Sequence, residues 1–278
     1  MKQLIFTLFL ISTTLLYGYS DSDMDGVEDE YDQCPNTPLT ELVDLRGCTT
    51  KTLISPHHFD IIVGMSYAAS DYQTLNATDT LSSTLQLDYY YKNYSLQLNS
   101  SYFTTDESSY SEDGLNDTYL GGAYQKSLSK DLFLRVSAGV LLPTYDTALN
   151  NNNSDYTAAI NGSYSVGDFD LFAGLSYTMI NDDDTVIVYD DNSTEQLSYQ
   201  NTLSYNAGLG YYASRSLYMS LSYAQSDSIY KNVDAIVSAT LYGYYSFDEN
   251  WFTTLSYSYG LSTSASDHYL SMKLGYFF

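Results

Sequence analysis

Basic residues are scarce in this chain of 278 residues, which has 10 Lys and Arg against 34 Asp and Glu and a formal net charge of −24. Nucleic-acid binding depends on clustered Lys and Arg that neutralise phosphates, so this composition excludes DNA and RNA as partners. The acids gather near the N-terminus and between the predicted strands. Two interpretations stay open: these acids keep the loops soluble, or they bind divalent cations and favour cationic solutes.

Long apolar runs are also lacking. No stretch beyond the N-terminus approaches the roughly 18 continuous apolar residues that a spanning helix needs, which excludes a helical membrane protein. The N-terminal run, residues 4–11, is too short to span a bilayer; it follows Lys2, and residues 18–20 supply a small-x-small site before Asp21. These features predict a cleaved secretory signal peptide over residues 1–20. No cysteine lies near this site, so we expect no lipid anchor.

Cysteine is almost absent, with only Cys34 and Cys48 in the chain. An even number of cysteines in an exported chain predicts a disulfide bond. Residues 21–50 contain both and form a module too small to build a sufficient hydrophobic core. We therefore expect a disulfide and a bound metal ion to stabilise this module in place of a core.

Carboxylates alternate directly after the predicted signal peptide, with the spacing of a calcium-binding loop. Oxygen donors stand at loop positions 1, 3 and 5, Gly26 at position 6 permits a sharp turn, and acids stand at positions 9 and 12. Ca²⁺ suits so many carboxylates in a flexible loop better than Mg²⁺ does. Position 12 is Asp rather than the Glu of an EF-hand, and the alternative is a metal-free, disordered acidic linker. The predicted ligands are Asp21, Asp23, Asp25, the backbone carbonyl of Val27, Asp29 and Asp32.

The run from Asp21 to Pro35 resembles a thrombospondin type 3 repeat of the kind found in bacterial OmpA-like proteins. Residues 36–38, 43–44 and 47–48 continue the likeness, which implies calcium binding and a second, incomplete site at Asp44. In OmpA-like proteins such repeats link a barrel to a peptidoglycan-binding domain. Here the module precedes the predicted barrel, so the resemblance does not imply cell-wall anchoring.

From residue 58 to residue 278, after a linker at 51–57, apolar and small polar residues alternate with a period of two, which predicts half-exposed β-strands. Tyr and Phe are abundant, at 32 and 11 residues. About twelve strands are expected, at 59–67, 81–89, 94–102, 120–124, 132–140, 156–164, 169–177, 197–209, 217–223, 237–241, 251–259 and 270–278.

Most of these strands have about ten residues, which at about 3.3 Å per residue and a tilt of about 40° span about 25 Å, the apolar height of an outer-membrane barrel. A soluble barrel would face its apolar rows inward, and these strands would then enclose too many Leu and Tyr side chains. Tyr residues at strand ends predict interfacial aromatic girdles. The predicted fold class is therefore all-β, a transmembrane antiparallel up-and-down barrel of about 12 strands.

The predicted connections alternate in length. Short connections are expected at 91–93, 127–130, 166–168, 213–215 and 246–250, and long ones at 69–80, 104–117, 143–155, 180–195, 225–232 and 260–267. This rhythm is typical of bacterial barrels whose termini both face the periplasm. It predicts a bacterial outer-membrane protein, embedded in outer-membrane lipid, with its calcium module in the periplasm and its long acidic loops outside.

Polar side chains that alternate with the apolar rows, and so point to the other face of each strand, are the candidates for the lumen. They are Gln86, Asp88, Gln97, Asn99, Arg135, Asn161, Asn206 and Lys273. Twelve strands enclose less space than a general porin, so side chains or loops can close the pore. The end of the chain, through Tyr276 to Phe278, resembles the assembly signal of outer-membrane proteins and implies recognition by the barrel-assembly machinery; the alternative is simply a last strand.

A second resemblance covers residues 114–124 and 140–144. These segments resemble porins of the phenol-degradation MetA-pathway transporter type, with Asn116 in place of the usual Gly. The resemblance implies passage of small, hydrophobic solutes through a barrel.

These patterns favour a narrow channel or transporter for small solutes, and the alternative is a structural or adhesive surface barrel without transport. A membrane-embedded enzyme is the third class, because His268 lies near Ser264 and Ser266 in the sequence. No nucleophile motif accompanies them, and adjacent His57 and His58 are poorly placed to share one ion. We expect no lipase activity and no other enzymatic function.

Overall fold

The structure, a computed structural model, describes residues 21, 23, 27–29, 31–35, 43, 45, 46, 48, 57–71, 77–107, 110–145, 153–188 and 194–278. The chain divides into two compact units, Met1–Ser55 and Pro56–Phe278. The predicted signal peptide and residues 51–56 of the predicted linker lie outside the described residues. No helix in the described part of the chain is long and apolar enough to cross a membrane.

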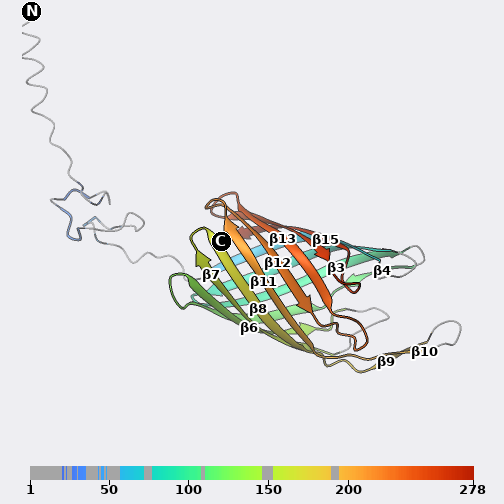
Figure 1. Cartoon of the computed structure of the whole chain (residues 1–278). Coiled ribbons are helices and arrows are strands. Elements are labelled where there is room, and N and C mark those ends of the chain that lie inside the picture. The colour runs from blue at the N-terminus through green and yellow to red at the C-terminus, as the bar shows by residue number, and fades with distance from the viewer. Residues whose placement is uncertain are drawn as a thin grey trace, which may run out of the picture. The chain divides into compact units, whose positions relative to one another are not determined.

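Twelve strands of the second unit close into an antiparallel barrel (Figure 1). They are β1 (His57–Ser70), β2 (Thr78–Tyr91), β3 (Tyr94–Glu107), β5 (Thr118–Ser127), β6 (Leu132–Leu142), β7 (Asp155–Val166), β8 (Phe169–Met179), β11 (Thr202–Tyr212), β12 (Leu217–Ser226), β13 (Ile236–Ser246), β14 (Trp251–Gly260) and β15 (His268–Phe277). Each pairs with its neighbours along the chain, and β1 pairs with both β2 and β15, so the sheet closes on itself. The predicted all-β barrel of about twelve strands is confirmed.

Three further strands lie outside the barrel wall. β4 (Tyr110–Leu115) folds back on the end of β3, while β9 (Thr185–Val188) pairs with β10 (Thr194–Leu197) in a separate hairpin. Figure 1 shows both hairpins extending from the same end of the barrel, the end that carries the longer connections. The sequence patterns predict only loops at these two places.

The predicted start of the eighth wall strand, at residue 197, is wrong. Leu197 belongs to β10, Tyr199 forms an isolated bridge with Tyr230, and the wall strand β11 begins only at Thr202. The apolar alternation continues through 197–199, but Asp184 accepts hydrogen bonds from the Ser198 hydroxyl and the Tyr199 amide. These bonds tie the segment to the preceding connection instead of to the wall.

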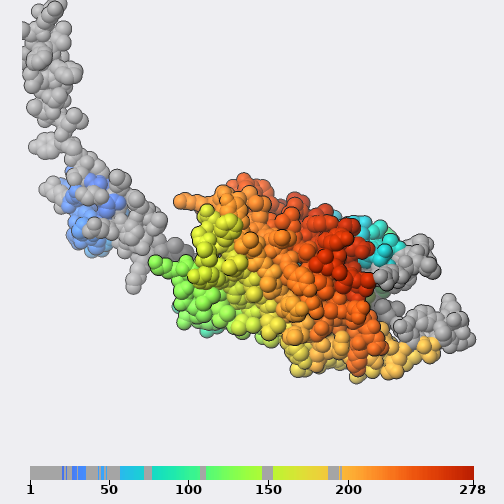
Figure 2. Space-filling view, in the orientation of Figure 1, coloured from blue at the N-terminus to red at the C-terminus, as the bar shows by residue number. Residues whose placement is uncertain are grey.

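The wall exposes its apolar side chains to the outside. Successive side chains of a strand point to opposite faces of the sheet, so one parity faces outward and the other inward. Outward residues remain exposed, as with Leu221 at 61%, Met272 at 60% and Met65 at 56%. In the space-filling view, the green-to-red part of the chain forms one continuous face of the barrel (Figure 2). An apolar surface of this extent is stable against lipid rather than water.

Aromatic rings border the short-turn end of this outer surface. Trp251 contacts Tyr276 with ring centroids 4.8 Å apart, and Phe59 stacks on Phe278 at 5.5 Å. At the other end, tyrosine hydroxyls are hydrogen-bonded, as where Tyr67 donates to Asp79 at 2.7 Å. Amphipathic rings favour membrane interfaces, so the two rows match the predicted girdles.

Candidate functional site

Inward-facing glycines make room for aromatic rings along the wall. A side chain at Gly121 or Gly139 would collide with the ring of Tyr119, and one at Gly210 would collide with the ring of Tyr218. Each ring can therefore lie over the neighbouring strand backbone. This arrangement leaves space inside a barrel that has many inward aromatic residues.

A cavity of about 680 Å³ occupies the short-turn end of the lumen. Strands β1, β2 and β13–β15 wall this cavity, here called the chamber, and the turn at Asp248–Asn250 borders it. Its lining includes Asp60, Asp88, Tyr90, Tyr242, Tyr244 and Lys273. A volume of several hundred cubic ångströms is what small-molecule sites commonly offer.

Two carboxylates lie side by side on one wall of the chamber. Asp60 on β1 is the cross-strand partner of Asp88 on β2, so both side chains point inward from adjacent positions. Asp88 is only 7% exposed, and its Oδ2 accepts a hydrogen bond of 2.7 Å from the Gln86 amide. The Oδ1 atoms of Asp60 and Asp88 are buried and have no hydrogen-bond partner. Burying such oxygens is costly unless a donor or cation meets them.

Among the described residues, no basic side chain forms an ion pair with either carboxylate. Within the described part of the chain, the one ion pair with N and O closer than 4.0 Å joins Lys231 to Asp184. Lys273 lines the same chamber, but its stem lies over Gly64, so close that a side chain there would meet Lys273 Cγ at 2.7 Å. His58, on the same strand as Asp60, stacks its ring on Phe277 at 5.1 Å. The chamber therefore keeps two adjacent acids with unused acceptor atoms.

Five of the eight predicted lumen residues fall into two groups. Gln86, Asp88 and Lys273 line the chamber. Across the barrel, the amides of Asn161 and Asn206 both approach Gly174 between them.

The remaining predicted positions lie on other parts of the wall. Gln97 is the cross-strand partner of Asp88, Asn99 is that of Gln86, and Arg135 on β6 faces Asn161 on β7. Asp60, Tyr242 and Tyr244 were not among the predicted residues. Each stands next to an outward apolar residue in its strand and therefore points inward. Their place in the chamber depends on how the strands are aligned, which alternation alone does not give.

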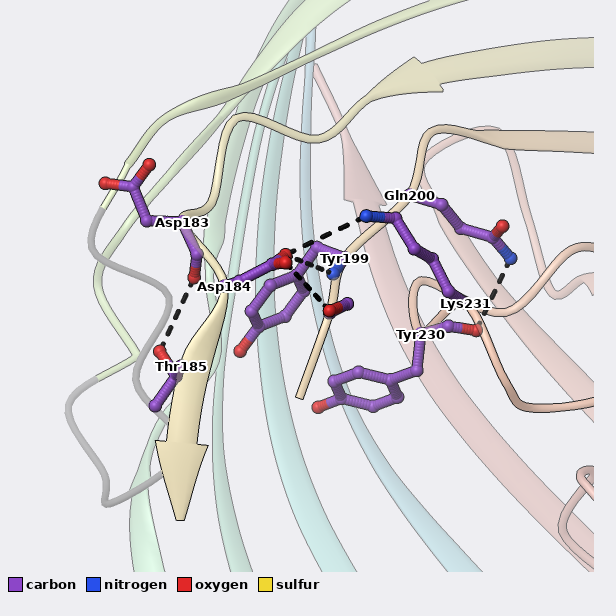
Figure 3. A network of polar contacts seen from close by, with 8 residues as sticks. Asp183, Asp184, Thr185, Tyr199, Gln200, Tyr230 and Lys231 are labelled. Atoms are coloured by element: carbon purple, nitrogen blue, oxygen red, sulfur yellow. Dashed lines mark hydrogen bonds and ion pairs between the residues drawn. The ribbon is translucent and has the colours of Figure 1, made fainter. Parts of the chain in front are cut away.

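At the long-loop end, two connections form one polar network (Figure 3). Asp184 accepts from the Ser198 hydroxyl at 2.8 Å and pairs with Lys231 at 3.9 Å. The Gln200 side chain donates to the Ser228 carbonyl at 2.9 Å, and the rings of Tyr199 and Tyr230 lie 5.4 Å apart. The Ser198 hydroxyl holds the pKa of the Asp184 carboxylate below its ordinary value.

The network joins the connection before β11 to the connection between β12 and β13. Tyr199 is 7% exposed and Ser228 4%, so these connections have a packed interior of their own. The mouth of the barrel is therefore structured rather than a set of independent loops.

Acidic side chains gather beside this network. Burial raises the pKa of Asp182 to about 6, and the charge of Asp155 adds to this effect. Burial likewise raises the pKa of Asp117. Asp155 Oδ1 accepts a hydrogen bond from the Asn181 amide at 2.8 Å. In the described ranges, no three His, Cys, Asp or Glu side chains converge to hold a metal ion.

The N-terminal unit contains the predicted disulfide. Cys34 and Cys48 are bonded, with Cα atoms 4.9 Å apart, and the Gln33 amide donates to the Arg46 carbonyl at 2.8 Å beside them. This prediction is confirmed.

The predicted calcium loop is described only in part. Asp21, Asp23, Val27, Asp29 and Asp32 lie within the described residues, whereas Asp25, Gly26 and Asp44 lie outside them. Oδ1 atoms of Asp21 and Asp23 are buried, and Asp32 Oδ1 accepts from the Cys34 amide at 2.8 Å. No three of these carboxylates converge on one point within the described residues, so the calcium site stays a prediction.

Two histidines of the barrel, His57 and His268, contact tyrosines on its outer surface. His268 Nδ1 is hydrogen-bonded to the Tyr257 hydroxyl at 2.8 Å, and His57 Nδ1 to the Tyr89 hydroxyl at 2.6 Å.

Comparison with known proteins gives a family and a fold. The family model described as "MetA-pathway of phenol degradation" matches residues 47–278. No curated protein matches the sequence.

Several solved barrels are similar in fold. An outer membrane channel from Pseudomonas putida F1 matches with a TM-score of 0.65 at 10% identity, covering 80% of this chain and 95% of that one. The translocator domain of the autotransporter NalP from Neisseria meningitidis matches with a TM-score of 0.51 at 14% identity, covering 80% and 88%. The β domain of the Bordetella autotransporter BrkA matches with a TM-score of 0.50 at 10% identity, covering 80% and 98%. At these identities the likeness concerns the fold alone.

Proposed function

Since this chain belongs to the MetA-pathway of phenol degradation family, we propose that it is a channel of the bacterial outer membrane for small solutes. The observation that carries the proposal is the chamber of about 680 Å³ inside a closed barrel whose outer face is apolar and exposed. A lipid-embedded barrel with a polar and aromatic lumen is suited to passage of small molecules rather than catalysis.

The solutes we propose are small aromatic or hydrophobic compounds. The family description refers to phenol degradation, and the chamber presents Tyr90, Tyr242, Tyr244 and Phe252 to its contents. Aromatic walls contact flat rings with favourable edge and stacking geometry. Inward polar groups beside them would fix a hydroxyl or a charged substituent.

Liposome swelling tests this function. The full chain is refolded into vesicles, which are then placed in isosmotic solutions of solutes of increasing size. Entry of the smallest solutes and exclusion of trisaccharides is the expected result, because a barrel of twelve strands encloses a narrower lumen than a general porin. Vesicles without protein serve as the control, and equal swelling of both would contradict transport.

A structural or adhesive surface barrel is the second candidate. The observation that favours it is the pair of hairpins, β3–β4 and β9–β10, extending from the long-loop end (Figure 1). Replacing residues 185–197 by a short Gly-Ser turn separates the two functions. Reduced cell attachment with unchanged solute entry would favour adhesion, and unchanged attachment would count against it.

The N-terminal unit we assign to the periplasm as a calcium-binding module of the thrombospondin type 3 kind. Asp21, Asp23, Asp29 and Asp32, with Asp25, would supply carboxylate ligands, and bound Ca²⁺ would stabilise a unit closed by one disulfide. Calorimetric titration of the full chain with Ca²⁺ tests this, and absence of binding would refute it.

Export and assembly complete the proposal. Residues 1–20 would be removed as a signal peptide. Tyr276 and Phe278 at the end of β15 would be recognised by the barrel-assembly machinery; both rings lie on the outer surface near Phe59. Truncation of Phe278 should lower the amount of folded barrel in outer membranes.

A further inference from the structure

Acids outnumber bases around the chamber. Asp60, Asp88, Asp248 and Glu249 line it, against a single basic side chain, Lys273. Backbone amides of Asn250 and Trp251 both donate to Asp248 at 2.8 Å and lower the pKa of its carboxyl, so this group at the entrance stays ionised. A cavity lined by excess negative charge in a low-dielectric wall concentrates cations.

The acid pair offers specific acceptor atoms and not only charge. Asp60 Oδ1 and Asp88 Oδ1 are buried without hydrogen-bond partners, and Asp88 as a whole is only 7% exposed. The protein supplies one donor to each carboxylate: Gln86 donates to Asp88 Oδ2, and the Tyr90 hydroxyl donates to the Asp60 carboxylate. Two adjacent unused carboxylate oxygens match the several N–H donors of one ammonium group.

Aromatic side chains supply the other half of a cation site. Tyr242 and Tyr244 project into the chamber from β13, and Tyr90 follows Asp88 by two residues on β2. Aromatic faces attract organic cations, and most strongly where the cation has lost water. A metal ion is less suited, because no third carboxylate, His or Cys joins the two acids within the described residues.

We propose that the chamber binds small organic ammonium ions, with the ammonium between Asp60 and Asp88 and the organic part against Tyr242 and Tyr244. This inference rests on the proposed channel function, and it defines the solute class that the channel would favour. Neutral analogues of the same shape would lack the charged contact and bind more weakly.

Binding and conduction can be measured separately. The full-length chain is refolded in detergent and titrated calorimetrically with benzylammonium, and with benzyl alcohol as the neutral analogue. Asp60→Asn and Asp88→Asn remove one charge each from the pair. Asp170→Asn is the matched control, because Asp170 is also inward-facing and 7% exposed but does not line the chamber. Heat-dependent gel migration checks that every variant is folded.

The native chain should bind benzylammonium at least tenfold more tightly than benzyl alcohol, since a hydrogen-bonded charge contact is worth about one such factor. Asp60→Asn and Asp88→Asn should each weaken the binding of benzylammonium about tenfold and leave the affinity for benzyl alcohol unchanged. The affinity of Asp170→Asn for benzylammonium should stay within about twofold of that of the native chain. Equal affinity for both compounds, or equal affinity in all three variants, would overturn the proposal.

Two further measurements test the class of ligand and the channel function separately. If benzylammonium does not bind, while Ca²⁺ binds and Asp60→Asn or Asp88→Asn weakens that Ca²⁺ binding, the pair is a metal site and the organic-cation assignment is wrong. Binding without conductance in bilayers would keep the site and refute the channel. Conductance without binding would keep the channel and refute the site.

Discussion

A charge placed on the outer face of the barrel should destabilise it, whereas the same charge one residue later should not. Leu221 lies midway along β12 (Leu217–Ser226), is 61% exposed, and has Leu209 and Leu241 as cross-strand partners. An Arg at the middle of a lipid-facing strand costs about 2–4 kcal/mol. Ser222 points into the lumen, so Ser222→Arg should cost about 1 kcal/mol or less.

Unfolding by urea in lipid vesicles measures this difference. The chain has a single tryptophan, Trp251, on the outward face near the short-turn end, where it is 43% exposed. Its fluorescence reports loss of the membrane environment in both variants, with no added probe. A larger loss of unfolding free energy in Ser222→Arg than in Leu221→Arg would mean that the two faces are assigned the wrong way round.

Three other perturbations test separate parts of the molecule. The raised pKa of Asp182 favours its protonated form in the fold, so its stabilising contribution is complete below the unfolded pKa and is lost as pH rises through about 6. Asp182→Asn should therefore be more stable than the native chain at pH 8, by at most about 1 kcal/mol after solvent screening, and no more stable at pH 3; equal curves at both pH values would refute this. Asp184→Ala should speed amide hydrogen exchange at Tyr199 without altering the wall strands, and exchange unchanged at Tyr199 would show that the network does not hold the mouth together. Cys34→Ser should weaken Ca²⁺ binding measured by calorimetry, since the disulfide fixes Cys34, whose amide donates to the predicted ligand Asp32, and identical affinity would separate the disulfide from the metal site.

The barrel wall could be predicted from the sequence because its signal is repeated and local. Most wall strands alternate apolar and polar residues, and lipid requires the side chains on the outward face to be apolar along the whole strand. The short turns followed from the same pattern. Even the cross-link between Cys34 and Cys48 needed only the number of cysteines and an exported chain.

Structure at the mouth could not be predicted in this way. β4, β9 and β10 have only four to six residues each, and their pairing depends on neighbours rather than on burial of one face. Tyr199 continues the alternation of β11 yet lies outside the wall, because Asp184 and Tyr230 hold it there. Contacts between distant loops leave no periodic trace in a sequence.

The chamber, too, could be predicted only in part. The alternation of apolar and polar residues identified Asp88, Gln86 and Lys273 as inward-facing, and all three line the chamber. Asp60 was missed because it lies among apolar residues, and only the register of β1 and β2 reveals that it stands beside Asp88. Strand alignment, set by the closure of the barrel, decides which inward side chains meet.

Single-channel recording of the refolded full-length chain tests the central proposal most directly. Planar bilayers are compared with and without Ca²⁺, and with and without residues 21–50. Steady conductance with a preference for cations is predicted, because acids exceed bases around the chamber. Silence in every condition, from protein shown to be folded by heat-dependent gel migration, would contradict a channel and favour a closed surface barrel.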